Sequence, residues 1–259
     1  MIDLHCHILP GIDDGAQTIE DSLDMARQAV CEGIHTIVAT PHHQNGKYIN
    51  EKNEVLQQVA ALNERLLQGS IPLTILPGQE IRIYGEMIED YRNGKILTLN
   101  HTNKYVFVEF PSSQVPQFTE RLFYNVQAGG LTPIIVHPER NSRLIEDPDI
   151  LYNLVNKGAM TQVTASSLTG RFGRKIKKFS MNLIDANLTH MIASDAHNIS
   201  GRSFYMQEAS ELISIEYGMD MLYMFQENAE AIVKGRACFK DTPEKMKKKK
   251  VSGDFLIVE

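Results

Sequence analysis

The chain has 259 residues, of which 42% are hydrophobic and 22% charged, and its formal net charge is −6 at pH 7. This composition is that of an ordinary soluble globular protein, and the length suits one large α/β domain. The acidic balance argues against stable binding to nucleic acid, which is a polyanion. The sequence contains no apolar run of about 18 residues, so we expect no transmembrane segment.

The three cysteines stand at positions 6, 31 and 238 and form no CxxC pair. Their odd number and the lack of a recognisable secretory leader indicate a reducing compartment. We therefore expect a cytoplasmic protein.

Apolar stretches of strand length alternate with segments of helical periodicity along the chain. The expected strands are residues 1–5, 35–40, 73–80, 105–110, 131–137, 159–166 and 190–197. After the first strand, Thr18 and Asp21 have the spacing of a helix-capping box, and apolar residues recur at helical spacing over residues 19–30. Further helices are expected at residues 55–66, 203–217 and 219–234.

Strands separated by helices require right-handed crossovers and therefore a parallel sheet. Such units can close into a barrel or remain an open doubly wound sheet. We expect an α/β fold of the TIM-barrel-like kind, a distorted (β/α)7 barrel, with residues 1–240 as a single domain. Five lysines lie between positions 245 and 250, and this run predicts a disordered Lys-rich tail over residues 241–259.

Six of the seven expected strands carry an imidazole or a carboxylate at the carboxyl end. These residues are His5, His7, His42, His43, Glu80, Glu109, His137, Asp195 and His197. In α/β folds the βα loops converge at this end, so we expect the side chains to lie together in space. Each residue alone has an ordinary explanation, such as a helix cap or an ion pair. Together they predict a metal site, because so many unpaired polar groups would be costly to bury.

The candidate ligands exceed the three or four that one tetrahedral zinc takes, so more than one ion is expected. Imidazole and carboxylate ligands without thiolate suit Mn²⁺, Fe²⁺ or Zn²⁺, and a carboxylate such as Glu80 can bridge two ions. Clusters of this kind activate bound water and favour hydrolysis of phosphate esters. By contrast, His35, His101 and His190 lie before strands or in a loop, and we expect them to be structural or exposed.

Four short motifs and Glu80 carry a family resemblance: DLHCH at residues 3–7, PHH at 41–43, HPER at 137–140 and ASDAH at 193–197. Their combination resembles the PHP (polymerase and histidinol phosphatase) family, which has a distorted (β/α)7 barrel and a trinuclear metal site. More narrowly, a second set of motifs is similar to the manganese-dependent bacterial protein-tyrosine phosphatases of the CpsB/YwqE type. This set is the opening segment at residues 1–15, GQEI at 78–81, VEF at 108–110, HPER at 137–140 and ASDAHN at 193–198. Phosphatases of that type act on tyrosine kinases of exopolysaccharide and capsule synthesis. The resemblance extends to about residue 238.

The resemblance implies a set of metal ligands for Mn²⁺, with two or three divalent ions in all. The set is His5, His7, Asp14, His42, Glu80, Glu109, His137, Asp195 and His197. Asp14 comes from the resemblance alone, and Asp13 beside it stays open as the alternative. The narrower resemblance also points to Arg140 and Arg202 as catalytic residues that bind the phosphate. A guanidinium group can hold two phosphate oxygens at once.

Thiol-based phosphatase chemistry has no candidate nucleophile in this sequence. It needs a reactive cysteine with an arginine about six positions later. The residues six positions after the three cysteines are Ile12, Ile37 and Glu244. We therefore expect any phosphatase activity to require metal and to survive thiol alkylation.

These observations predict a metal-dependent phosphatase that hydrolyses phosphotyrosine on proteins with a metal-activated hydroxide. The resemblance implies an autophosphorylated tyrosine kinase as the partner. The basic segment at residues 171–178 either forms the solvent-exposed face of a helix or attracts an acidic tail of that kinase. Asp14 and His43 are candidates for a general acid. Two alternatives remain: a phosphatase of a small phosphomonoester such as histidinol phosphate or a nucleotide, and a non-catalytic metal-dependent module whose tail binds an anionic membrane or nucleic acid.

Overall fold

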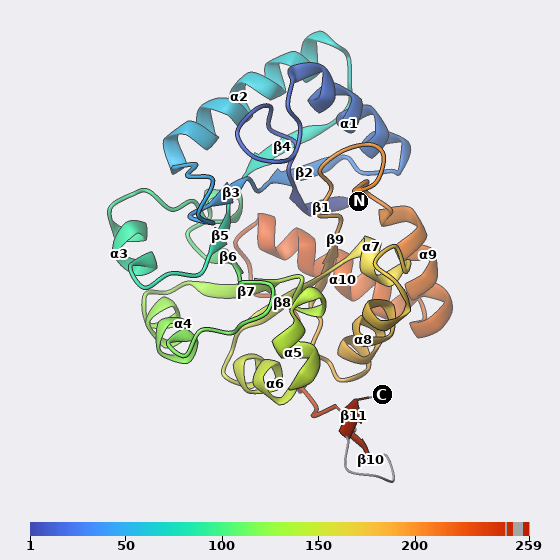
Figure 1. Ribbon diagram of the computed structural model, residues 1–259. Coiled ribbons are helices and arrows are strands. Elements are labelled where there is room, and N and C mark those ends of the chain that lie inside the picture. Colours follow the sequence, from blue (N-terminus) through green and yellow to red (C-terminus); the bar gives the residue numbers. More distant parts are fainter. Residues whose placement is uncertain (247, 251–255, 259) are drawn as a thin grey trace.

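The computed structural model describes residues 1–246, 248–250 and 256–258, the last two ranges as strands only. Parallel strands occupy the centre and helices cover them (Figure 1). The strands are β1 (Ile2–Cys6), β2 (Thr36–Ala39), β3 (His42–His43), β4 (Thr74–Pro77), β5 (Glu80–Arg82), β6 (Tyr105–Glu109), β7 (Thr132–Val136), β8 (Met160–Thr164), β9 (Met191–Ala193), β10 (Lys248–Lys250) and β11 (Leu256–Val258). The α-helices are α1 (Ile19–Cys31), α2 (Lys52–Gln68), α3 (Met87–Arg92), α4 (Thr119–Ala128), α5 (Ser142–Glu146), α6 (Asp149–Asn156), α7 (Ala165–Leu168), α8 (Arg174–Asp185), α9 (Met206–Tyr217) and α10 (Met219–Val233), and the 3₁₀ helices are η1 (Leu99–His101) and η2 (Pro138–Arg140).

Two parallel sheets make up the centre of the fold. One has the order β1-β2-β4, and the other has the order β3-β5-β6-β7-β8-β9. They adjoin at two places. Strands β2 and β4 continue after short breaks into β3 and β5, and on the other side His7 N–H donates to the carbonyl of Ala196 at 2.9 Å, next to a parallel bridge between Cys6 and Ala196. The prediction of an α/β fold with parallel sheets is confirmed.

The prediction of one strand over residues 73–80 is wrong, because the structure has two strands there, β4 and β5, separated by a break. The break falls at Gly78, where an added Cβ would lie 2.8 Å from Cγ1 of Val38 on β2. The chain therefore passes β2 too closely for a side chain at this point. Between β2 and β3 the break falls at Thr40 and Pro41, and proline has no N–H for the ladder.

The capping box predicted for the first helix is confirmed. Thr18 Oγ1 accepts from Asp21 N–H at 3.1 Å, and an Asp21 carboxylate oxygen accepts from Thr18 N–H at 2.9 Å. The helix predicted over residues 203–217 begins later, at Met206. Its amino end is capped by a distant side chain, because Glu32 accepts the N–H of Met206 at 2.7 Å.

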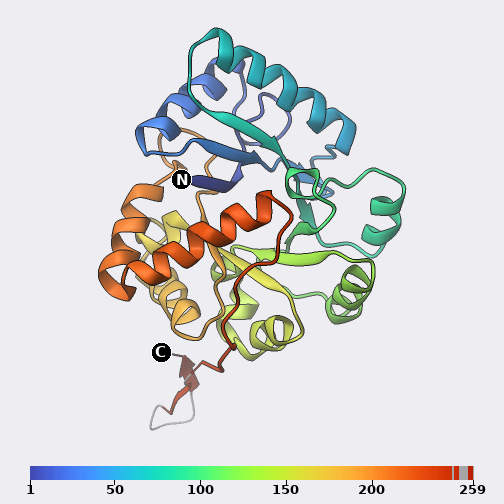
Figure 2. The ribbon, with the colours of Figure 1, turned by 180° about the vertical axis from the view of Figure 1, so that it is seen from behind.

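The apolar residues form two separate cores. One fills the space between the strands and the outer helices. The other lies among the strands and includes Leu4, Phe107 and Ile134, and residues of α10 such as Ile232 close it. Helix α10 crosses the side of the molecule that faces the viewer in Figure 2. The strand ends on the opposite side are left for the loops that carry the polar residues.

The described chain after α10 runs back along the molecule. Glu244 N–H donates to the carbonyl of Ala186 at 2.8 Å, and Met246 is buried. Strands β10 and β11 pair in antiparallel fashion. Residues 247, 251–255 and 259 of the predicted tail lie outside the described residues, so disorder over residues 241–259 stays a prediction. Within the described part of the chain, no helix has both the length and the apolar character needed to cross a membrane.

Candidate metal centre

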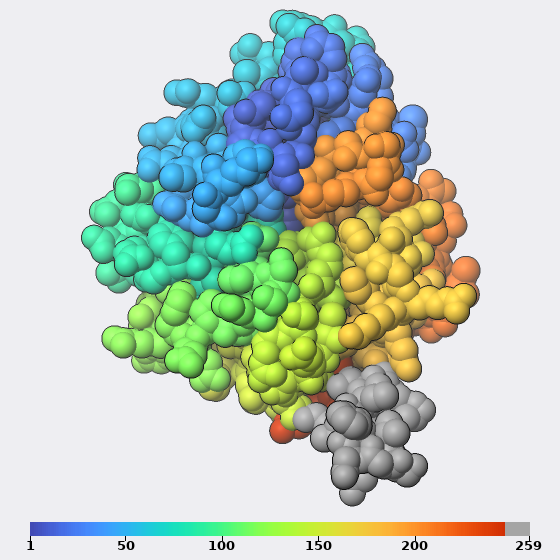
Figure 3. Space-filling view, viewed as in Figure 1, coloured from blue at the N-terminus to red at the C-terminus, as the bar shows by residue number. Residues whose placement is uncertain are grey.

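Most of the residues predicted as ligands lie at or just after the carboxyl ends of β1, β6, β7 and β9. His42 and Glu80 instead begin β3 and β5, a few residues after the ends of β2 and β4. Asp14 comes from the loop after β1. Among the described residues, histidine and acidic side chains form three groups whose potential ligand atoms lie within 4.8 Å of one another. In the space-filling view of this face, the amino-terminal, green and orange segments meet around a recess (Figure 3).

The first group contains the two histidines of the opening motif together with Glu80 and Asp195. The Nε2 atoms of His5 and His7 are 3.3 Å apart, as expected for residues two apart in an extended strand. Each lies 3.3 Å from Oδ1 of Asp195. Glu80 Oε2 lies 3.5 Å from the first imidazole and 3.3 Å from the second. All four side chains are buried.

The second group shares His7 and adds Asp14, His42 and His197. Oδ1 of Asp14 lies 3.3 Å from Nε2 of His42 and 3.5 Å from Nε2 of His197. The rings of His7 and His197 stack with their centroids 3.8 Å apart. Asp14 is the exposed member of the group, with 43% of its side chain accessible, and it therefore lies at the mouth of the site.

The third group consists of His42, Glu80 and Glu109. Nδ1 of His42 lies 2.8 Å from Oε2 of Glu80 and 3.9 Å from Oε2 of Glu109. His137 belongs to none of the three groups, but its Nε2 lies 2.6 Å from Glu80 Oε1. The three groups are therefore linked into one cluster, because Glu80, His7 and His42 each belong to two of them.

The two predicted phosphate-binding arginines approach this cluster from different loops. Arg140 ends η2, after β7, and its Nη2 lies 2.7 Å from Oδ2 of Asp195. Nη2 of Arg202 lies 3.4 Å from the same oxygen, and its Nη1 lies 3.4 Å from Oδ2 of Asp14. The side chain of Arg140 is 21% exposed and that of Arg202 is 36% exposed. Two guanidinium groups therefore meet at one edge of the ligand cluster.

The opening motif folds back on itself so that Asp13 and Asp14 have different surroundings. Ala16 N–H donates to the carbonyl of His7, and a Cβ at Gly15 would lie 2.0 Å from that carbonyl oxygen. Only glycine fits this close approach. Asp13 is buried and its Oδ2 accepts from Nδ1 of His7 at 2.7 Å, whereas Asp14 takes part in the second ligand group.

Three further contacts orient the candidate ligands, and none of them was predicted from the sequence. Gln162 Oε1, on the one expected strand that lacks an imidazole or carboxylate at its end, lies 2.9 Å from Nδ1 of His5. Arg82 donates from Nε and Nη2 to the two oxygens of Glu109, both at 3.0 Å. Nδ1 of His197 lies 2.9 Å from the carbonyl of Asp195. A polar residue in a wholly buried strand is the signal that could have identified Gln162.

His43, a candidate general acid, is not brought to the cluster. Alternation along β3 places it on the opposite side from His42. Burial lowers its pKa, and the charged groups that act on it are Glu51, Asp90 and Lys95. These residues belong to the region of α2 and α3 and not to the ligand groups.

Burial and neighbouring charges lower the pKa of some histidines of the cluster and raise that of others. Burial lowers the pKa of His137 to about 4, and the charge of Arg140 acts in the same direction. Burial and the nearby His7 lower the pKa of His197 to about 4. Burial opposes protonation of His42 too, but Glu80 and Asp14 raise its pKa to about 10. The imidazoles of His137 and His197 are therefore neutral near pH 7, and the neutral imidazole is the form that binds metal.

Two residues of the site have backbone conformations that are rare for side chains with a Cβ. His137 has φ of 36° and Asp195 has φ of 54°. Such left-handed conformations are strained and cluster at functional sites, where the surrounding structure holds them. Here His137 N–H donates to the carbonyl of Gln162 and Asp195 N–H to that of His5, both at 2.8 Å.

The cysteines do not provide a thiol nucleophile. Cys6 is the last residue of β1, between His5 and His7, and it is buried. That burial and nearby carboxylates raise its pKa well above the ordinary value. Cys31 is exposed on α1, and Cys238 is half-buried beside Tyr105. None of these surroundings favours a reactive thiolate at the cluster.

Comparison with known proteins agrees with this geometry. The family model for capsular polysaccharide synthesis proteins, CpsB/CapC, matches residues 1–234. The chain is 50% identical to tyrosine-protein phosphatase YwqE of Bacillus subtilis (strain 168) over 255 residues, which cover 98% of this chain and 100% of the relative. It is 30% identical to tyrosine-protein phosphatase CpsB of Streptococcus agalactiae over 240 residues, covering 90% and 98% of the two chains.

A solved structure extends the similarity to three dimensions. It comes from work on YwqE of Bacillus subtilis and CpsB of Streptococcus pneumoniae, described there as unique metal-dependent tyrosine phosphatases. The superposition has a TM-score of 0.93 at 50% identity and covers 95% of this chain and 100% of the other. The chain therefore belongs to the CpsB/CapC family of capsular polysaccharide synthesis proteins.

Proposed function

We propose that this protein hydrolyses phosphotyrosine on proteins in a reaction that depends on divalent metal ions. The observation that carries the proposal is the meeting of Arg140 and Arg202 at Asp195, a carboxylate of the first ligand group. Guanidinium groups beside a metal cluster are suited to a phosphoryl group, which carries several negative oxygens. The names of the relatives support phosphotyrosine as the substrate.

The chemistry of the cluster fits metal ions. Nδ1 of His42, Oε2 of Glu80 and Nε2 of His197 are buried, and their close contacts with charged neighbours lack the geometry of a hydrogen bond. Neutral imidazole nitrogens and carboxylate oxygens without thiolate are suited to Mn²⁺, and also to Fe²⁺ or Zn²⁺. We assign His5, His7, Asp14, His42, Glu80, Glu109, His137, Asp195 and His197 as the ligands of two or three ions. When bound, the ions would lower the pKa of water and offset charge on the phosphoryl oxygens.

The protein's own side chains have defined parts in this reaction. Arg140 and Arg202 bind the phosphoryl oxygens and stabilise the charge that develops on them. Gln162 holds the ring of His5 through the Nδ1 atom of that ring, and Asp13 holds the ring of His7 in the same way. The leaving group is a phenolate whose conjugate acid has a pKa near 10, so its departure needs little help from a general acid.

The partner, the location and the barrel fold expected from the sequence are part of the same proposal. The likeness to proteins of capsule synthesis favours a bacterial tyrosine kinase of exopolysaccharide synthesis as the partner and the cytoplasm as the location. The two cores and the parallel bridge from Cys6 on β1 to Ala196 after β9 support one distorted (β/α)7 barrel over residues 1–240. In this arrangement β2 with β3, and β4 with β5, each count as one interrupted strand.

The first experiment measures phosphate release from a phosphotyrosine peptide, a phosphoserine peptide and histidinol phosphate. Each substrate is tested with Mn²⁺, with a chelator, and with Mn²⁺ after thiol alkylation. We expect selective cleavage of phosphotyrosine that needs metal and survives alkylation. Preference for histidinol phosphate would move the function to a small phosphomonoester, and no release from any substrate would overturn the assignment as a phosphatase.

A further inference from the structure

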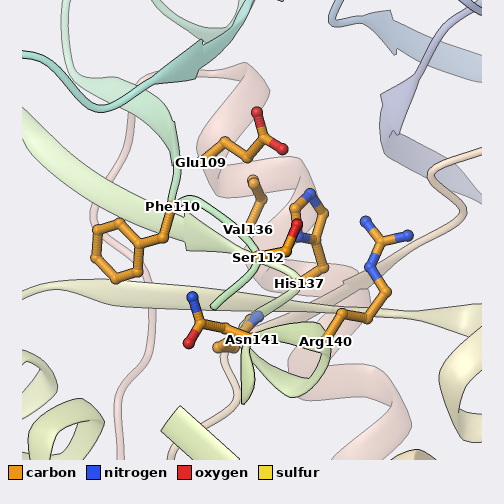
Figure 4. Close-up of a pocket in the computed structure, with 8 residues that line it drawn as sticks. Glu109, Phe110, Ser112, Val136, His137, Arg140 and Asn141 are labelled. Atoms are coloured by element: carbon orange, nitrogen blue, oxygen red, sulfur yellow. The ribbon is translucent and has the colours of Figure 1, made fainter. Parts of the chain in front are cut away.

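A hollow of about 230 Å³ opens beside the ligand cluster, between the ends of β6 and β7 (Figure 4). Its walls are Glu109, Phe110, Ser112, Val136, His137, Pro138, Arg140 and Asn141. Figure 4 shows these side chains arranged around the space. The hollow is therefore next to the edge at which Arg140 approaches Asp195.

The walls of this hollow differ in chemistry from one side to the other. Glu109, His137 and Arg140 belong to the proposed metal and phosphate site. Phe110 and Val136 present apolar groups and are almost wholly buried in the walls. A ligand that fits both sides has an anionic group at one end and an apolar group directly attached to it.

The outer wall of the hollow is fixed before any ligand binds. Nδ2 of Asn141 donates to the carbonyl of Pro111 at 2.7 Å and to that of Gln114 at 3.0 Å. Ser142 N–H donates to the carbonyl of Ser112 at 2.9 Å. The ring of Phe110 stacks on that of Phe123 with centroids 6.1 Å apart. A preformed wall costs little ordering entropy on binding.

We propose that this hollow receives the aromatic ring of the substrate and thereby selects aryl phosphates over alkyl phosphates. The inference rests on the proposed function, since it places the phosphoryl group at Arg140. A phenyl ring bonded to the ester oxygen then extends along Phe110 and Val136 and leaves water. The short aliphatic side chain of phosphoserine has much less apolar surface to bury there.

Ser112 and Ser113 provide a matched pair for the test. Both are exposed in the loop after β6, but only Ser112 lines the hollow. Ser112→Phe places a ring in the proposed subsite, and Ser113→Phe adds the same group outside it. We expect Ser112→Phe to lower kcat/KM for a phosphotyrosine peptide at least about tenfold, the scale of a filled apolar subsite. Ser113→Phe should leave that value unchanged.

Two non-hydrolysable inhibitors separate the ring from the phosphoryl group. Phenylphosphonate and methylphosphonate carry the same anionic head, so both report on the proposed metal and arginine site. We expect Ser112→Phe to weaken inhibition by phenylphosphonate about tenfold and to leave that by methylphosphonate unchanged. Equal weakening of both inhibitors, or no change in either, would overturn the aryl subsite.

Failure of this inference is distinguishable from failure of the proposed function. A wild-type protein that cleaves phosphotyrosine while Ser112→Phe behaves like Ser113→Phe keeps the function and loses the subsite. A wild-type protein that cleaves no phosphotyrosine loses both. Ser112→Leu, a smaller filler, is measured alongside, and thermal unfolding of all variants establishes that the differences come from folded protein.

Discussion

Oδ2 of Asp13 accepts a hydrogen bond from Nδ1 of His7 at 2.7 Å and another from the backbone N–H of His42 at 3.2 Å. The other oxygen, Oδ1, accepts from the N–H of Gly15 at 2.8 Å. With both oxygens occupied, Asp13 orients the imidazole of His7 and leaves its Nε2 directed to the ligand groups. Asp14 next to it takes part in the cluster directly.

Asp13→Asn is expected to weaken metal binding without removing a ligand. The amide cannot supply the negative charge that raises the basicity of the His7 ring, and losses of about 10- to 100-fold in affinity follow from such changes. The measurement is calorimetric titration of the metal-free protein with Mn²⁺. Asp24→Asn, on the exposed face of α1, serves as the control. An unchanged Kd in Asp13→Asn would contradict the orienting role.

Most of the candidate ligands could be predicted from the sequence because each follows a strong local signal, whereas Asp14 came only from the family resemblance. His42, Glu80 and His137 all stand at the carboxyl ends of apolar stretches, and parallel topology alone brings such ends together. The capping box at Thr18 was equally local. These features depend on residues a few positions apart, for which the spacing is sufficient.

The contacts that hold the ligands could not be predicted in the same way. Gln162 reaches His5 across 157 positions, and Glu32 caps α9 across 174. Neither pair shares a local pattern, since only the packing of distant strands and helices brings the partners together. The division of the strand at residues 73–80 has a similar origin, because it depends on the close approach of Gly78 to Val38.

The bidentate pair of Arg82 and Glu109 gives a prediction about stability. Arg82 is 25% exposed and Glu109 is 11% exposed, and burial with the nearby Glu80 raises the pKa of Glu109 to about 7. Arg82→Met leaves this carboxylate without its charged partner. In chelator we expect the free energy of unfolding to fall by about 2 kcal/mol, as for a lost charged hydrogen bond. With Mn²⁺ the loss should be smaller, because a cation can then neutralise Glu109.

Urea unfolding with and without Mn²⁺ measures both values for Arg82→Met. Arg143→Met is the matched control, since Arg143 pairs with Asp147 on the surface. An exposed pair contributes at most about 1 kcal/mol, with or without metal. If Arg82→Met lost the same free energy of unfolding in chelator and in Mn²⁺, a bound cation would not replace Arg82 in neutralising Glu109.

Arg140 and Arg202 should differ in their contribution to the reaction. Arg140 is the more buried and lies closer to Asp195, at 2.7 Å compared with 3.4 Å. Lysine cannot reproduce the planar fork of a guanidinium group. Arg140→Lys is expected to lower kcat/KM for a phosphotyrosine peptide by about 100- to 1,000-fold, and Arg202→Lys to lower it less. Steady-state kinetics in Mn²⁺ test this order, with Arg27→Lys on α1 as the control, and full activity in Arg140→Lys would contradict it.

His190 provides a pH dependence of stability away from the metal ligands. It is 3% exposed, its Nδ1 accepts the N–H of Thr161 at 3.1 Å, and burial with a smaller effect of Lys240 lowers its pKa to about 3. The folded protein thus keeps His190 neutral at pH 5. An unfolded chain protonates a histidine below its ordinary pKa of about 6.5. The stability contributed by the neutral ring is therefore complete above pH 6.5 and is lost as the pH falls toward 3.

His190→Gln isolates this effect, because the other histidines titrate in both proteins. The free-energy gap between wild type and variant should narrow below pH 6.5 by about 1.4 kcal/mol per pH unit. Urea unfolding at pH 7.5, 6 and 5 in the same buffer ions measures the gap. An equal free-energy gap at pH 7.5, 6 and 5 would show that His190 is protonated in the folded protein at low pH. The structure opposes this, because a protonated Nδ1 could not accept the hydrogen bond from Thr161.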